Sequence, residues 1–68
     1  MTQFVDIIRV WDRDGEEREF EIDRVGGHYT VTLDNVIYST TETYREARDQ
    51  IIDAIQHKGW TFSKPWTS

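Results

Sequence analysis

Apolar and polar residues alternate along most of the first forty residues, with the period of two that is typical of strands with one buried face. Three turn signals divide this stretch. Residues 12–16 carry Asp at the start of a type I turn and Gly where a positive φ is needed. Residues 26–27 (Gly-Gly) suit a two-residue primed turn, and residues 34–35 (Asp-Asn) tolerate the same left-handed backbone. The pattern therefore predicts four strands joined as an antiparallel meander.

Pairing the strands across these turns gives one consistent sheet. The predicted opposite pairs are Ile8–Phe20, Arg9–Glu19, Ile22–Val31, Phe20–Leu33, Leu33–Val36 and Val31–Tyr38. Directly paired residues share a face, so one face becomes apolar and the other mostly polar. The apolar face collects Ile8, Val10, Phe20, Ile22, Tyr29, Val31, Leu33, Val36 and Tyr38. The polar face collects Arg9, Trp11, Glu17, Glu19, Glu21, Asp23, Thr30, Thr32 and Ile37.

A helix is predicted over residues 41–58, where apolar residues recur at helical spacing. Ser39 and Glu42 have the spacing of a capping box at its start, and Lys58 followed by Gly59 is typical of a helix end. The apolar stripe consists of Tyr44, Ala47, Ile51, Ala54 and Ile55. This stripe should cover the apolar sheet face. The expected fold is α+β, a four-stranded antiparallel meander followed by one amphipathic helix packed on one face (ββββα).

Two parts of the chain leave alternatives open. The predicted register places Asp6 on the apolar face. Three explanations are open: the first strand starts at Ile7, it contains a bulge, or Asp6 pairs with Arg24. The aromatic C-terminal tail either adds an edge strand beside the first strand or packs on a partner. Its aromatic residues are Trp60, Phe62 and Trp66. The positions expected to be most buried are Phe20, Val31, Leu33, Tyr38, Ala47 and Ile51.

Composition narrows the function classes. A chain of 68 residues has room for one small domain, spanning 1–68, and a deep catalytic pocket would take core volume from it. Cys is absent and no apolar run approaches the length of a membrane span, so a cytoplasmic location without membrane contact is expected. Thirteen acidic residues against eight basic ones give a net charge of -5, which disfavours direct binding to nucleic acid.

Three groups of residues invite a chemical interpretation, and a structural role explains each. Residues 12–16 resemble part of a calcium loop but lack the further oxygen ligands that calcium needs. His28 flanks a turn and His57 lies in the last helical turn, without the partners of a zinc site. The hydroxyls at residues 39–43 have no neighbouring base and suit helix capping. We therefore predict no catalytic, metal or cofactor site, and no enzyme.

The second strand carries a row of acidic residues on the polar face, about 6.7 Å apart at the usual rise of a strand. The row consists of Glu17, Glu19, Glu21 and Asp23. Such a row favours a basic partner or an imitation of nucleic acid, whereas the simpler interpretation is a solvated strand face. Three apolar residues of the first strand, Val5, Ile7 and Trp11, are expected on the same side and need a cover. These seven residues are the candidate partner-binding set.

The segment Tyr38-Ser39-Thr40, followed by Glu42 and by Arg45-Glu46-Ala47 at the start of a helix, resembles part of a known family. It is similar to the sheet-then-helix plan of the N-terminal DNA-binding domains of some phage-type integrases. In domains that look like this the exposed sheet face is basic, whereas the exposed face here is acidic. The resemblance therefore implies no function for this chain.

The sequence favours a non-catalytic interaction module that binds a protein partner or itself. The alternative is an acidic DNA-mimic inhibitor, of the kind carried by phages, that blocks a nucleic-acid-binding protein. A small enzyme that uses the hydroxyl cluster is the third hypothesis. The residues alone do not identify the partner, the pathway or the oligomeric state.

Overall fold

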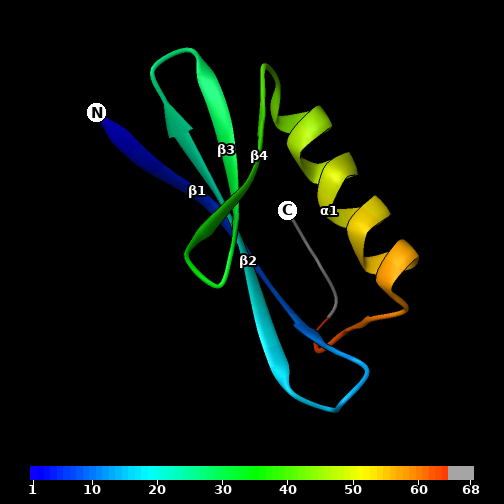
Figure 1. Cartoon of the computed structure of the whole chain (residues 1–68). Coiled ribbons are helices and arrows are strands. Elements are labelled where there is room, and N and C mark those ends of the chain that lie inside the picture. Colours follow the sequence, from blue (N-terminus) through cyan, green and yellow to red (C-terminus); the bar gives the residue numbers. More distant parts are fainter. Residues whose placement is uncertain (65–68) are drawn as a thin grey trace.

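A computed structural model of the chain describes residues 1–64. The elements are β1 Thr2–Trp11, β2 Glu17–Val25, β3 His28–Leu33, β4 Val36–Thr41, α1 Tyr44–Lys58 and β5 Thr61–Phe62. The strands form one antiparallel sheet in the order β4-β3-β2-β1-β5, and α1 packs on one face of it (Figure 1). The predicted ββββα fold is confirmed, and β5 beside β1 confirms the tail as an edge strand. Trp66, also expected in this tail, lies outside the described residues.

The three predicted turns are present, and local chemistry explains each. The Asp12 carboxylate accepts hydrogen bonds from the backbone N–H groups of Asp14 and Glu16, both at 2.9 Å, which holds the first turn closed. In the second turn, Gly26 has a φ of 62°. Asp34 and Asn35 have φ values of 50° and 69°, so the third turn takes the predicted left-handed backbone at both central positions.

The predicted register holds for β1–β2 from Asp6 to Trp11, for β2–β3 and for the turn end of β3–β4. The prediction that pairs Val31 with Tyr38 is wrong, because a bulge shifts the register and Val31 pairs with Ser39. The extra residue leaves the Tyr38 ring in edge-on contact with Phe20, at 5.9 Å between centroids. It also keeps Thr41 on the buried face, where its hydroxyl donates to the Thr43 carbonyl at 2.9 Å.

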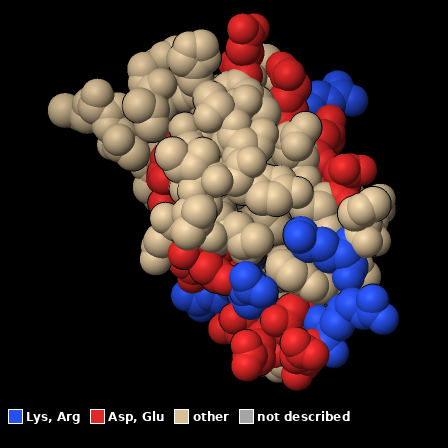
Figure 2. Space-filling model, viewed as in Figure 1, with Lys and Arg blue, Asp and Glu red and all other residues tan. Residues whose placement is uncertain are grey.

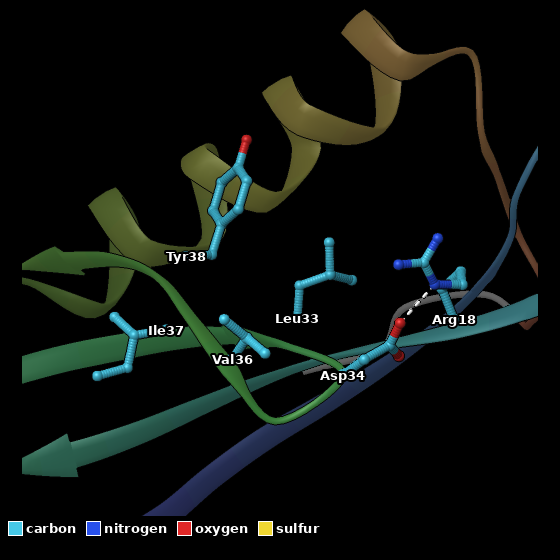
Figure 3. Close-up of a pocket in the computed structure, with 6 residues that line it drawn as sticks. All are labelled: Arg18, Leu33, Asp34, Val36, Ile37 and Tyr38. Atoms are coloured by element: carbon cyan, nitrogen blue, oxygen red, sulfur yellow. Dashed lines mark hydrogen bonds and ion pairs between the residues drawn. The ribbon is translucent and has the colours of Figure 1, made fainter.

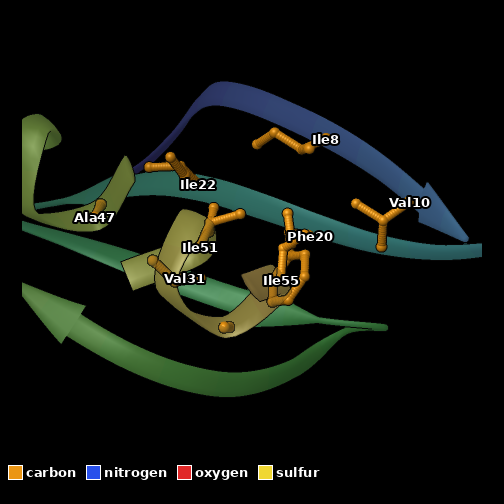
Figure 4. Close-up of a cluster of buried hydrophobic side chains, with 9 residues drawn as sticks. Ile8, Val10, Phe20, Ile22, Val31, Ala47, Ile51 and Ile55 are labelled. Carbon is orange, nitrogen blue, oxygen red and sulfur yellow. The ribbon is translucent and has the colours of Figure 1, made fainter. Parts of the chain in front are cut away.

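The core lies between the sheet and α1 (Figure 4). Its buried residues are Ile8, Val10, Phe20, Ile22, Val31, Ala47, Ile51, Ala54 and Ile55. Four of the six positions predicted to be most buried are among them. Leu33 is only half-buried and Tyr38 is exposed, so these two predictions are wrong. Val36, also assigned to the apolar face, is 69% exposed. Leu33, Val36 and Tyr38 all line a surface hollow at the turn end of the β3–β4 hairpin, which the buried core does not reach.

The helix begins at Tyr44, later than predicted, because Thr43 rather than Ser39 is its N-cap. The Thr43 hydroxyl accepts the Glu46 N–H at 3.1 Å and donates to the Glu46 carboxylate at 3.0 Å. Ser39 instead belongs to β4. The predicted end at Lys58 and Gly59 is confirmed, with Gly59 in the left-handed region at a φ of 72°.

Trp60 follows the helix end and packs against the core. The backbone N–H of Trp60 donates to the Ile55 carbonyl at 3.0 Å. The centroid of the Trp60 ring lies 6.2 Å from that of the Phe20 ring. The cations of Arg18 and Lys58 lie over the Trp60 ring, at 5.0 and 5.2 Å from its centroid. Trp60 therefore joins the end of α1 to β2 just before the chain enters β5.

Candidate interaction surface

The sheet face opposite α1 carries most of the candidate residues. We call it the outer face. On it, side chains of β1 stand directly opposite side chains of β2. Its cross-strand pairs are Phe4–Asp23, Ile7–Glu21, Arg9–Glu19 and Trp11–Glu17. The outer face thus joins an apolar strand to an acidic one.

A bulge in β1 decides which residues reach the outer face. Phe4 pairs with Asp23 and Asp6 pairs with Ile22, so Val5 is the extra residue. Of the three alternatives for Asp6, the bulge is therefore correct. Asp6 stays on the helix side, where the Tyr44 hydroxyl donates to its carboxylate at 2.9 Å.

The bulge removes one residue from the candidate partner-binding set and adds another. Val5 packs against the core instead of lying on the outer face, so its predicted placement is wrong. Phe4 takes an outer position, and it is 59% exposed. Sequence reasoning missed Phe4. The available signal was Asp6, since an acid at a buried position already suggested a shift in register.

The acidic row of β2 lies on one face, as predicted from its alternation. Hydrogen bonding to Asp23 raises the pKa of Glu21 above its usual value, and burial and the negative charges of Asp23 and Glu19 raise it further. Among the ion pairs within residues 1–64, only that of Arg9 with Glu19, at 3.4 Å, involves this row. The carboxylates of the row are therefore crowded and only partly neutralised.

The apolar side chains of β1 remain accessible beside this row. Trp11 is 44% exposed, and Ile7 is also exposed. The strand β5 pairs with β1 at Val10 and Trp11, and the Ser63 hydroxyl donates to the Glu17 carboxylate at 3.3 Å. Residues 61–62 thus extend the sheet sideways at the Trp11 end of β1.

A second feature is a hollow of about 280 Å³ at the end of the β3–β4 hairpin (Figure 3). Its lining residues are Arg18, Leu33, Asp34, Val36, Ile37 and Tyr38. Arg18 is ion-paired with Asp34 and lies 3.6 Å from the Asp12 carboxylate. The Arg18 guanidinium lowers the pKa of Asp34, and Asp34 in turn raises the pKa of Arg18. Arg18 thus connects the β1–β2 turn, through Asp12, to the β3–β4 turn, through Asp34.

Two of the three candidate chemical groups contain side chains with a structural role. Thr41 and Thr43 use their hydroxyls at the start of α1, and the Asp12 carboxylate closes its own turn. Within residues 1–64, no group of three or more His, Asp or Glu side chains is arranged to hold a metal ion. In the same part of the chain, no helix is both long and apolar enough to span a bilayer.

Comparisons with known proteins add no relative. No protein-family model matches the chain, and neither a curated protein nor a solved structure matches it. The outer face and the edges of the sheet are therefore the features of this protein that bear on its function.

Proposed function

We propose that this chain is a non-catalytic protein-binding module that docks a basic partner on its outer face. The observation that carries the proposal is the pairing of exposed apolar side chains on β1 with the row of four carboxylates on β2. The two rows offer different contributions to one interface. The apolar side chains supply area that gains by leaving water, and the carboxylates select a cationic partner.

Crowding of the carboxylates supports a partner of this charge. The raised pKa of Glu21 means that its ionised form is disfavoured beside Asp23 and Glu19. Lysine or arginine side chains brought close to the row would stabilise the ionised forms. Trp11 lies at one end of the same surface, and Trp is enriched among residues that dominate binding energy.

The test is an NMR titration of the ¹⁵N-labelled protein with a synthetic peptide rich in Lys and Arg that contains one aromatic residue. We expect amide shifts to concentrate in β1 and β2 and the affinity to fall as salt is added. Shifts that spread evenly over all acidic residues, or that concentrate in α1, would refute docking on the outer face.

A row variant tests the charges directly. Changing Glu17→Gln, Glu21→Gln and Asp23→Asn leaves the ion pair between Arg9 and Glu19 in place. We expect this variant to bind the peptide at least about tenfold more weakly, a loss of about 1.4 kcal/mol. Its melting temperature should not fall, because the change removes repulsion between crowded carboxylates.

A matched control removes the same number of charges elsewhere. Glu42→Gln, Asp49→Asn and Asp53→Asn neutralise three exposed acids in or next to α1. We expect the control to weaken binding by no more than about twofold, through loss of long-range attraction only. Equal losses in the two variants would mean that net charge, and not the outer face, attracts the peptide.

The apolar half of the surface needs its own variant. Trp11→Ser should weaken binding by about fivefold or more, the effect of losing about 1 kcal/mol at a binding hot spot. Because Trp11 also pairs with Thr61, a melting curve must accompany the measurement. Unchanged affinity in a folded Trp11→Ser protein would remove β1 from the proposed interface.

Imitation of nucleic acid is the second candidate, and the spacing of the acidic row favours it. Alternate residues of β2 repeat at about 6.7 Å, about twice the 3.4 Å rise per strand of duplex DNA. The two proposals separate by competition. A protein captured from a lysate that duplex DNA displaces supports mimicry, whereas one that DNA leaves bound supports a different basic surface.

A further inference from the structure

The strand β4 (Val36–Thr41) forms one edge of the sheet, and only β3 pairs with it among the described residues. An antiparallel edge strand directs part of its backbone N–H and C=O groups away from its neighbour. Val36 is 69% exposed and Ile37 is 71% exposed. This edge therefore presents unpaired backbone groups together with accessible apolar side chains.

The opposite edge of the sheet is different. There β5 (Thr61–Phe62) covers β1 only at Val10 and Trp11, so most of β1 also has an open side. That part of β1 contains the charged residues Asp6 and Arg9 and a bulge at Val5, and charges and bulges hinder pairing with another strand. Lys and Pro, which often protect edges, are both absent from β4. Of the two edges, β4 is the better template for another strand.

Charge distinguishes β4 from the rest of this acidic chain. The chain has a net charge of -5, but β4 contains no ionisable side chain except Tyr38. Figure 2 shows an uncharged area over β3 and β4, with charged side chains gathered near the β1–β2 turn and along α1. Two like-charged copies of the chain would therefore repel each other least where their β4 strands meet.

We propose that β4 pairs with β4 of a second copy of this chain, giving an antiparallel strand pair and a continuous sheet across a symmetric dimer. An antiparallel pair of identical strands is self-complementary, which a two-fold axis requires. The inference is independent of the proposed function, because the outer-face residues of β1 and β2 lie beyond β3 from this edge.

The bulge at Tyr38 limits the strength of the pairing. It interrupts β4 between Ile37 and Ser39, and bulges are one way in which edge strands resist association. The dimer therefore joins short strands and forms in a concentration-dependent equilibrium.

The first measurement uses the unmodified protein. We expect the weight-average mass from sedimentation equilibrium to rise from the monomer towards the dimer value between micromolar and millimolar concentration. Amide NMR signals of residues 36–41 should shift with concentration while those of β1 stay in place. A monomer at all concentrations, or shifts confined to β1 and β5, would overturn the proposal.

Two variants test the location of the contact. Ile37→Glu places a negative charge in β4 of both copies, close to the proposed two-fold axis. The two charges repel each other, so dimerisation should weaken about tenfold or more. Val25→Glu makes the same kind of change at another exposed apolar position, in β2, and should leave dimerisation within about twofold of the unmodified protein. Equal weakening by both variants would contradict pairing through β4.

Salt distinguishes this contact from the proposed basic partner. Added salt screens the repulsion between two chains of charge -5, so dimerisation through the uncharged β4 should strengthen. Binding of a basic peptide to the outer face should weaken under the same change. A self-association that weakens with salt would identify an ionic contact elsewhere and refute the β4 dimer.

Discussion

Truncation of Ile51 tests the packing that holds α1 on the sheet. Ile51 lies in the middle of α1 and is fully buried in the core. Ile51→Ala removes three carbon groups, and at about 0.8 kcal/mol for each buried group the transfer loss is about 2.4 kcal/mol. A cavity that does not collapse adds to this loss, so we expect a total of about 3–4 kcal/mol.

The expected loss is large compared with the stability of so small a protein. At about 0.05–0.15 kcal/mol per residue, a chain of this length has about 3–10 kcal/mol of unfolding free energy. Urea unfolding followed by tryptophan fluorescence should show a lower midpoint with an unchanged m-value. If Ile51→Ala is already unfolded in water, Ile51→Val should show a graded loss of about 0.5–1.5 kcal/mol.

The matched control is the same truncation at an exposed position. Ile37→Ala, measured at micromolar concentration, should change the unfolding free energy by no more than about 0.5 kcal/mol, because Ile37 is 71% exposed. Equal losses at the two positions would show that Ile51 does not occupy the core, and the packing of α1 would have to be revised.

Two further predictions concern helix capping and acid stability. Thr43→Ala removes the hydroxyl that accepts the Glu46 N–H, so the unfolding free energy should fall by about 1 kcal/mol, whereas Thr40→Ala should change it little; equal effects would contradict the assigned cap. The pKa of Asp34 is lowered by Arg18, so this ion pair contributes stability above the ordinary pKa of an Asp, and the contribution is lost as pH falls through the lowered value. Stability measured from pH 6 down to pH 2 should therefore fall less steeply in Asp34→Asn than in the unmodified protein, and parallel curves would rule out this linkage.

Features set by local chemistry were predictable from the sequence. Gly59 ends the helix and Asp34 with Asn35 makes a left-handed turn, because few residue types adopt positive φ easily. The acidic row on β2 was also predictable in full, since alternation alone places its four members on one face once the strand is recognised.

Features that depend on distant contacts were not predictable in the same way. The β4 bulge accompanies the contact of Tyr38 with Phe20, and the β1 bulge leaves Asp6 in contact with Tyr44. The alternation of apolar and polar residues does not reveal that a strand has one extra residue, so Val5 was assigned to the wrong face. The helix start was misplaced for a related reason. Several hydroxyls precede α1, and the one that caps it depends on where β4 ends.

The order in which strands pair has a consequence for the chain as it is synthesised. Each of β1 to β4 pairs with its neighbour in sequence, whereas β5 pairs with β1 across some fifty residues, from Val10 to Phe62. A ribosome adds about 5–20 residues per second, and a hairpin forms in about 1–10 µs. Pairing within the meander is therefore fast once its strands are available, and β5, which is the last element to be added and closes the longest loop, joins the sheet after it. Until β5 joins, the whole far side of β1 is open, including its Trp11 end. In the folded protein β5 closes only that end, at Val10 and Trp11, so its late arrival protects the part of β1 that is least able to protect itself by charge or by a bulge.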